Sequence, residues 1–251
     1  MDRLFGRHAV REALRANRRS FARLFIADGV QRDASVIADI LALAKERGVR
    51  VETAARDQLD RATPQNHGVV LECGDYPLVN LDDILDYAVA QSASPLVLML
   101  DTIQDPQNLG TLIRTAEAAG VHGVVMAQHR SVSVTPAVVH ASSGAAEHMR
   151  MAQVVNLART IEDLKHHDIW VAALHGDAEA RDIYSVNLTG GLALVVGNEG
   201  EGVRRLLRDK SDFVLKLPMV GTVESLNAAV AGSVALYEVL RQRRVAGKTQ
   251  T

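Results

Sequence analysis

Residues 96–127, LVLMLDTIQDPQNLGTLIRTAEAAGVHGVVMA, decide the fold of this chain. Two short apolar runs, LVLML at 96–100 and GVVMA at 123–127, enclose a segment in which Leu109, Leu112, Ile113 and Ala116 recur at helical spacing. Asp105-Pro106 or Asn108 can begin this helix, and Gly120 can end it. The sequence therefore predicts a strand, a helix and a second strand here.

Three further apolar runs follow along the chain, IWVAAL at 169–174, LALVVG at 192–197 and FVLKLP at 213–218. Continuous Val and Leu runs separated by helical patterns are typical of parallel strands that helices cover on both faces. We therefore predict an α/β fold with a mostly parallel sheet. In such sheets ligands bind where strands end and helices begin, so the strand-to-helix junctions are the places to look for chemistry.

The N-terminal part predicts a smaller α/β domain. Helical patterns at 7–17 and 34–48 alternate with strand patterns at 23–28, 49–54 and 67–73. The stretch 74–95 carries Pro, Ser and Asp at both ends of one short helical pattern. We expect a domain at 1–75, a linker at 76–95 and a second domain at 96–251.

Composition favours an ordinary globular protein. The chain has 251 residues, of which 47% are hydrophobic and 23% charged, and its net charge is −2. The single Cys73 cannot form an internal disulfide, and the arginine-rich start lacks the apolar core of a signal peptide. No apolar run has the length of a membrane span. These features predict a cytoplasmic protein without a membrane partner.

Positive charge gathers at the start of the chain. Arginines recur at every fourth position from Arg3 to Arg23, and on a helix the first four would share one broad face. Leu4, Val10 and Leu14 would then point toward a core. This arginine face is either a solvated flank or a footprint for the phosphate backbone of a nucleic acid, with Arg7, Arg11 and Arg15 as its contacts.

The first junction, DPQNLGTLIR at 105–114, places Arg114 off the apolar stripe of its helix. Helical side chains lean toward the N-terminus, so Arg114 points back over Gly110, which offers no side chain to obstruct it. Its guanidinium would lie near the free amides of the first turn and near Asn108, where an anion is favoured. The alternative is an ordinary surface arginine behind an N-cap asparagine.

The second junction, GNEGEG at 197–202, is glycine-rich but carries Glu199 and Glu201 and no lysine. It fits neither a phosphate-binding loop nor the dinucleotide fingerprint, and two carboxylates would repel a pyrophosphate. The ligand should be neutral or cationic. S-adenosylmethionine, which has an ammonium and a sulfonium and no phosphate, satisfies this condition. The alternative is a plain helix start.

The third junction, LPMVGTVESLNAAVAGS at 217–233, brings Ser225 and Asn227 to the start of a long helix that we expect to continue to about Arg244. Ser225 is the expected cap. The small residues from Ala228 to Ser233 allow another backbone very close, either inside the domain or across a subunit contact.

Together the three junctions resemble the SpoU/TrmH-type RNA ribose 2'-O-methyltransferases of the SPOUT superfamily. The family's first motif, N-x-G-x-x-x-R, is similar to NLGTLIR at 108–114, its second to VVGNEGEGV at 195–203 and its third to LPMVGTVESLNAAVA at 217–231. FGRHAVREAL at 5–14 and HGVVLE at 67–72 resemble the family's small N-terminal RNA-binding domain of L30e-like fold. The resemblance covers the chain almost end to end.

The resemblance implies a trefoil-knotted catalytic domain, a homodimer and S-adenosylmethionine as cofactor. By match to the family's motifs, the cofactor-binding positions are Gly197, Leu217, Met219 and Leu226. The positions associated with catalysis are Asn108, Arg114, Glu199, Ser225 and Asn227. Arg114 would either activate the ribose hydroxyl or hold the adjacent phosphate and stabilise the developing alkoxide.

No metal is expected, because His140, His148, His166 and His167 have neither zinc-ligand nor H-E-x-x-H spacing. Within the family, the two-domain layout, SSGAAEH at 142–148 and VGNEGEG at 196–202 are most similar to bacterial enzymes that methylate a guanosine ribose in the peptidyl-transferase P loop of 23S ribosomal RNA. Two alternatives stay open: the same reaction on tRNA, and a non-catalytic RNA-binding or ribosome-assembly protein.

Overall fold

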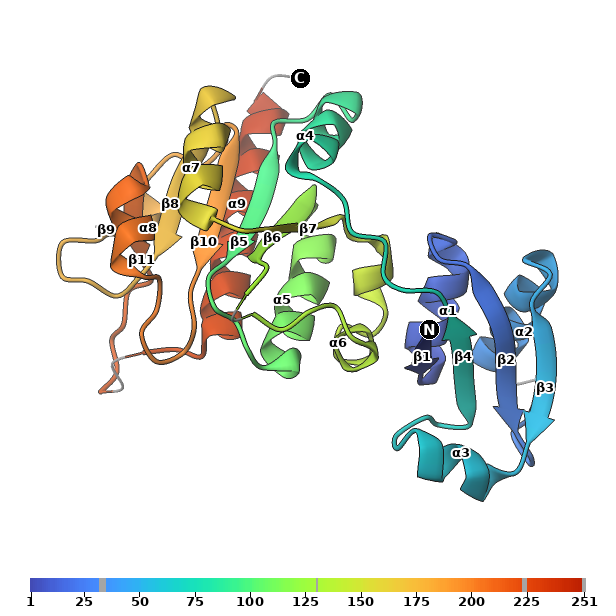
Figure 1. Cartoon of the computed structure of the whole chain (residues 1–251). Coiled ribbons are helices and arrows are strands. Elements are labelled where there is room, and N and C mark those ends of the chain that lie inside the picture. The colour runs from blue at the N-terminus through green and yellow to red at the C-terminus, as the bar shows by residue number, and fades with distance from the viewer. Residues whose placement is uncertain (32–34, 130, 223–224, 250–251) are drawn as a thin grey trace. The chain divides into compact units, whose positions relative to one another are not determined.

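The computed structural model describes residues 1–31, 35–129, 131–222 and 225–249 of the chain (Figure 1). Its residues form two compact units. Unit 1 comprises Met1–Pro77 and Ser133–His148, and unit 2 comprises Leu78–Val132 and Met149–Thr251.

Unit 1 is a four-stranded sheet with helices. Its strands are β1 (Asp2–Phe5), β2 (Phe21–Ala27), β3 (Arg50–Ala54) and β4 (Val69–Cys73), in the order β1-β4-β2-β3. β4 is antiparallel to β1 and β2, whereas β2 and β3 are parallel. The helices from the N-terminal part are α1 (Arg7–Ala16), α2 (Ser35–Glu46) and α3 (Arg56–Ala62).

Helix α1 differs from the predicted arginine face. Its apolar side packs inward as expected, with Val10 and Leu14 fully buried. The chain turns at Gly6, whose φ of 85° is a conformation that side-chain-bearing residues rarely adopt, so β1 and α1 are separate elements. Arg3 therefore lies on a strand, and the expectation that the first four arginines share one helical face is wrong. Only Arg7, Arg11 and Arg15 lie on the helix.

A segment from the second half of the chain completes unit 1. Residues 133–148 contain α6 (Pro136–Ala141) and the short 3-10 helix η1 (Ala145–His148), which contact β1 and α1. Gly144 allows this approach, because a Cβ at this position would lie 2.6 Å from the Cβ of Glu12. The expected division into 1–75 and 96–251 did not foresee this exchange, which arises from tertiary contacts rather than from local sequence.

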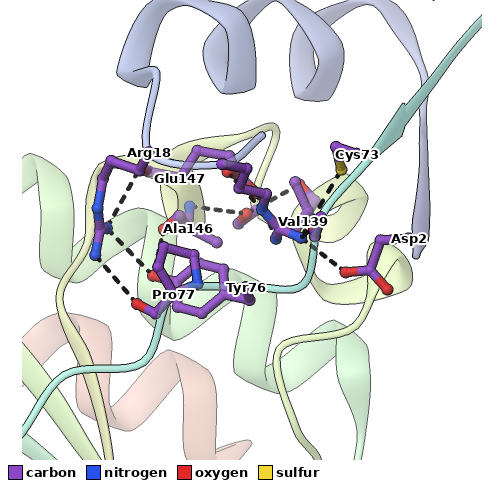
Figure 2. A network of polar contacts seen from close by, with 11 residues as sticks. Asp2, Arg18, Cys73, Tyr76, Pro77, Val139, Ala146 and Glu147 are labelled. Atoms are coloured by element: carbon purple, nitrogen blue, oxygen red, sulfur yellow. Dashed lines mark hydrogen bonds and ion pairs between the residues drawn. The ribbon is translucent and has the colours of Figure 1, made fainter. Parts of the chain in front are cut away.

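Buried polar groups join this segment to the N-terminal residues. The side chains of Arg19 and Glu147 are 0% and 1% exposed, and Arg19 Nη2 lies 2.7 Å from Glu147 Oε1. Arg19 Nη1 also donates to Asp2 Oδ2 over 2.7 Å. Figure 2 shows the neighbouring contacts, in which Tyr76 donates to the carbonyl of Ala146. We call Asp2, Arg19, Tyr76 and Glu147 the buried polar cluster.

Unit 2 is built on a seven-stranded sheet. Its strands are β5 (Leu96–Leu100), β6 (Gly123–Ala127), β7 (Met151–Val154), β8 (Trp170–Leu174), β9 (Arg181–Asp182), β10 (Leu192–Val196) and β11 (Phe213–Lys216). Their order is β7-β6-β5-β10-β8-β11-β9, and all neighbouring pairs are parallel. The predicted α/β fold with a parallel sheet and a small N-terminal domain is confirmed. Strands β7 and β9, which the sequence analysis did not predict, are short and carry polar residues.

Helices cover both faces of this sheet. One face packs in a common core with α4 (Leu81–Ala90), α7 (Leu157–His166) and α8 (Arg205–Lys210). α4, which we expected in a linker, contributes the fully buried Ile84, whose side chain occupies the space that a Cβ at Gly123 would need. The other pair of helices is α5 (Pro106–Ala118) and α9 (Ala228–Thr249), and the short 3-10 helix η2 (Ile183–Ser185) follows β9 (Figure 1).

The small residues of α9 serve packing inside unit 2. A Cβ at Gly232 would lie 2.6 Å from Leu112 of α5 and 3.1 Å from Val196 of β10, so α9 lies unusually close to both elements. Ser233 and Thr115 share a hydrogen bond of 2.9 Å across the same contact. The small residues from Ala228 to Ser233 were expected to serve either packing inside the domain or a subunit contact. The structure shows that they serve packing inside the domain.

Candidate active site

The glycine-rich loop at 197–202 follows β10 and folds tightly on itself. Asn198 Oδ1 accepts hydrogen bonds from the amides of Gly200 and Glu201 over 3.0 and 2.7 Å, and the Gly202 amide donates to the Asn198 carbonyl over 3.1 Å. Asn198 Nδ2 donates to Thr102 Oγ1 at the end of β5. The loop is thus held from within and tied to the next strand of the sheet.

Glycine is required at both ends of this loop. A Cβ at Gly197 would lie 2.0 Å from the carbonyl of Gly202 and 2.3 Å from the amide of Val203. Gly202 has a φ of 68°, and a Cβ there would lie 2.4 Å from His175 Nδ1. The two glycines therefore let the loop close at its base, which leaves Glu199 and Glu201 exposed at its tip.

Three predicted catalytic residues meet beside this loop. Glu199 Oε1 accepts a hydrogen bond of 2.8 Å from Asn108 Nδ2 and a second hydrogen bond from Asn227 Nδ2. Asn227 Nδ2 also donates to Asn108 Oδ1 over 3.1 Å. These residues come from the three separate junctions at the ends of β5, β10 and β11. We call Asn108, Glu199 and Asn227 the junction network.

The helix caps orient two members of the network. Asp105, one of the two expected caps, accepts from the amides of Gln107 and Asn108 and so fixes the first turn of α5. Asn227 Oδ1 accepts from the amides of Ala229 and Val230 at the start of α9. The expectation that Ser225 caps this helix is wrong, because the helix begins at Ala228 and Asn227 is the residue in position to cap it.

A cavity of about 210 Å³ opens next to the junction network. The four predicted cofactor-binding residues line it, together with Glu199 and Ser225; those four are Gly197, Leu217, Met219 and Leu226. Met219 and Leu226 are each about 40% exposed although they are apolar. The cavity thus combines apolar side chains, glycine backbone and two carboxylates, since Glu201 also lines it.

The loop that follows β8 was not predicted from the sequence. Leu174, His175 and Gly176 line the same cavity, and so does Lys216 from β11. His175 Nε2 lies 3.1 Å from Asp177 Oδ1, and the His175 amide donates to the Leu215 carbonyl. β8 lies between β10 and β11 in the sheet, so its carboxyl end must lie between theirs. Gly176, two residues after an apolar strand, was the signal that could have revealed this junction.

Arg114 lies apart from the cavity lining. It belongs to α5, six residues after Asn108, and its side chain is exposed. Gly110, the position over which Arg114 was expected to lie, is buried.

Among the described residues, no group of three or more His, Cys, Asp and Glu side chains is placed to hold a metal ion. Within the same ranges, no helix combines the length and the apolar character that crossing a membrane requires.

Two family models match the chain. The model of the SpoU rRNA Methylase family matches residues 95–237, and the model described as RNA 2'-O ribose methyltransferase substrate binding matches residues 3–79. YacO of Bacillus subtilis (strain 168), which is named for the TrmH family of tRNA/rRNA methyltransferases, is 41% identical over 250 residues, 98% of each chain.

Solved structures agree with the fold. The SpoU methyltransferase AviRb from Streptomyces viridochromogenes, crystallised in complex with AdoMet, matches 97% of this chain and 90% of its own with a TM-score of 0.79 and 24% identity. A structure described by the 2-OH methylation of C/U34 on tRNA matches 61% of this chain and 98% of its own, with a TM-score of 0.53 and 31% identity. By its two matching family models and its relatives, the chain belongs to the SpoU rRNA methylase family, whose members use S-adenosylmethionine to methylate RNA.

Proposed function

We propose that this chain transfers a methyl group from S-adenosylmethionine to the 2'-hydroxyl of a guanosine ribose in 23S ribosomal RNA, in the P loop of the peptidyl-transferase centre. The observation that carries the proposal is the junction network, in which Asn108, Glu199 and Asn227 meet beside the cavity. Residues from three separate strand ends converge there. A reaction between two substrates needs groups that hold both of them in position.

The cavity suits the proposed cofactor. Leu217, Met219 and Leu226 offer apolar surface to an adenosine, and Gly197 lines the cavity without a side chain. Glu199 and Glu201 favour a ligand with positive charge and disfavour a phosphate. When bound, S-adenosylmethionine supplies an electrophilic methyl group on a sulfonium.

The protein's own residues have distinct roles in this proposal. Asn108 and Asn227 hold the Glu199 carboxylate in one orientation through their amide groups. Ser225 lines the cavity and offers a hydroxyl to the substrate. Arg114 is exposed, and its guanidinium offers five N–H donors and no acceptor. We therefore assign Arg114 to the phosphate and the developing alkoxide rather than to proton abstraction.

A homodimer is part of the proposal. Helix α9 exposes Val230, Val234 and Tyr237 by 47%, 39% and 52%. These positions follow one another at helical spacing and form an apolar row, which a second copy would cover. Replacing Val234 with Asp should convert a dimer to monomers in light scattering, and an unchanged mass would contradict this assignment.

Unit 1 is proposed to bind the RNA, in a cytoplasmic setting, through Arg7, Arg11 and Arg15. The match at residues 3–79 to a substrate-binding model supports this role. The support is strongest for Arg7, because Arg11 and Arg15 both form ion pairs with Glu12, and Arg15 also pairs with Asp39.

The deciding experiment is methyl transfer to separated RNAs. The protein is incubated with labelled S-adenosylmethionine and purified 23S RNA, 16S RNA or tRNA, and the modified ribose is mapped. A single 2'-O-methylguanosine in the 23S P loop is the expected result, whereas methylation of tRNA alone would transfer the activity to that substrate. The extra part of this chain relative to the C/U34 tRNA structure favours ribosomal RNA. If calorimetry detects no S-adenosylmethionine binding, the chain is a non-catalytic RNA-binding protein.

A further inference from the structure

Unit 1 contains a second cavity, of about 460 Å³, that the proposed chemistry does not use. It lies at the start of α1 and is lined by basic and aromatic side chains, namely Arg7, His8, Arg56, His67 and His140. No Asp or Glu of the described residues lines it. We call it the basic pocket.

The charges of the basic pocket are only partly neutralised. Arg7 donates from Nε to the backbone carbonyl of His67 and forms no ion pair with a carboxylate of the described residues. Arg56 is 54% exposed and pairs with Asp60, four residues later on the same exposed helix. Exposed ion pairs of this kind contribute little to the stability of the fold, so another anion can replace the aspartate. The pocket therefore offers two guanidiniums to an anion.

Aromatic rings form one wall of the pocket. The rings of Phe5 and His140 stack with centroids 4.7 Å apart, and those of His140 and His67 lie 6.3 Å apart with planes inclined by 20°. The side chain of His67, at the end of this row, is exposed. A planar imidazole in this position is a platform on which a nucleobase stacks.

The pocket depends on the segment that unit 1 receives from the second half of the chain. His140 lies on α6, inside the range that matches the methylase model rather than the substrate-binding model. Its Nδ1 lies 3.3 Å from the Phe5 carbonyl, and a Cβ at Gly6 would come within 2.7 Å of the same atom. The absence of a side chain at Gly6 thus leaves room for the His140 ring in the wall of the pocket.

We propose that the basic pocket binds one nucleotide of the RNA substrate, with its phosphate at Arg7 and Arg56 and its base on His67. A volume of this size exceeds what a lone phosphate needs and matches pockets for small ligands. The proposal rests on the proposed function, since it supplies a contact for the RNA that unit 2 methylates.

The test uses two arginines on the same helix. Arg56 lines the pocket, whereas Arg61 does not, and each forms an ion pair with an aspartate one turn away. Binding of the full-length protein to the RNA that it methylates is measured at several salt concentrations. Arg7→Gln and Arg56→Gln should each weaken binding by about fivefold to tenfold and reduce the salt slope by about one, while Arg61→Gln stays within about twofold.

A second pair of variants tests the base. His67→Ala should weaken RNA binding by about tenfold, and His67→Phe, which keeps a planar ring, should restore most of it. S-adenosylmethionine binding should be the same in all variants, which shows that unit 2 is intact. Equal effects of Arg56→Gln and Arg61→Gln on RNA affinity would contradict RNA binding in the basic pocket. Full RNA affinity in His67→Ala would contradict it as well.

Two further outcomes separate this inference from its alternatives. If the wild-type protein methylates RNA but the pocket variants bind RNA normally, the basic pocket does not bind RNA and the proposed function stands. If the wild-type protein binds no RNA, the proposed function itself fails. A free nucleotide is the other source of the same chemistry, so uridine 5'-monophosphate is titrated alone; we expect only millimolar binding, and micromolar binding that Arg7→Gln abolishes would overturn the RNA assignment.

Discussion

The cavity of unit 2 and the basic pocket of unit 1 differ in the charge of their walls and in how those walls are built. The unit 2 cavity carries two carboxylates, one lysine and much glycine backbone, whereas the unit 1 pocket carries guanidiniums and imidazoles without an acid among the described residues. The cavity of unit 2 thus favours a cationic ligand, and the basic pocket favours an anionic one. Under the proposed function, the cavity of unit 2 suits the charge of the methyl donor, and the basic pocket of unit 1 adds a contact for the RNA backbone.

The supporting structures differ as well. In unit 2 Asn108 and Glu199 follow β5 and β10, two strands whose side chains are wholly apolar and buried. In unit 1 the segment that carries His140 is held through the buried polar cluster. Unit 1 should therefore be the more sensitive of the two to the loss of a single charge.

The largest effect is expected from Glu147→Ala, which leaves Arg19 buried without its main partner. Burial raises the pKa of Glu147, and the adjacent Arg19 guanidinium opposes this rise. Removing one member of a buried pair costs about 3–5 kcal/mol of the free energy of unfolding. Hydrogen exchange should accelerate in β4 of unit 1 and stay slow in β10 of unit 2.

The matched control is Asp57→Asn, which removes an exposed ion pair with Arg61 in the same unit. This change should cost less than about 1 kcal/mol. Equal exchange rates in β4 for the Glu147 and Asp57 variants would show that the buried polar cluster does not hold unit 1 together.

A smaller but still large effect is expected from Glu199→Ala. The carboxylate accepts from both Asn108 and Asn227, so its removal releases both amides. We expect single-turnover methyl transfer to slow by about 100-fold, because misplaced catalytic groups lose rate on this scale. RNA binding should not change. Glu199→Gln keeps an oxygen that accepts hydrogen bonds and separates the network from the charge; wild-type rates in both variants would exclude Glu199 from catalysis.

The next effect concerns the base of the glycine-rich loop. Gly197→Ala places a methyl group within 2.0 Å of the Gly202 carbonyl, whereas Gly200→Ala would meet only the Asn198 side chain at 3.8 Å. We expect Gly197→Ala to weaken S-adenosylmethionine binding by at least about tenfold, since the loop must open to relieve the overlap. Gly200→Ala should bind normally in calorimetry. Similar affinities for the two variants would mean that the loop does not contact the cofactor.

The smallest effect is expected at Cys73, which borders the buried polar cluster. Burial raises the pKa of this thiol to about 11, although Arg19 Nη1 lies 4.0 Å from its sulfur and favours the thiolate. At pH 8 about one thiol in a thousand is then ionised, and the thiolate is the reactive form. The native protein should not react with a thiol reagent at pH 8, while the unfolded protein should. Rapid labelling of the native protein would show that the cluster opens readily.

The sequence predicted the parallel sheet because runs such as 96–100 and 192–196 are continuously apolar, and such runs have few other uses. The junction residues were found because their types repeat the motifs of one family. Periodicity did not reveal β1, where Asp2 and Arg3 hide an edge strand. The trefoil knot stays a prediction from the family resemblance.

Contacts between distant parts of the chain were beyond local patterns. Arg19 and Glu147 are separated by 128 residues, and nothing near either one announces the other. The spacing of His140 excluded it only as a metal ligand, and the structure places it in the wall of the basic pocket. A site built from two remote segments requires a structure to be seen.

The chain enters and leaves unit 1 more than once, at 77, 133 and 148, and this has a practical consequence for dissecting the protein. A protease that cut only after Pro77 would not release the N-terminal fragment, because α6 and η1 would still hold it through non-covalent contacts. Conversely, deleting residues 1–77 would leave α6, whose Val138 and Val139 are buried, without its contacts to β1 and α1. Truncation after Pro77 should therefore yield an aggregation-prone fragment rather than an independently folded catalytic domain.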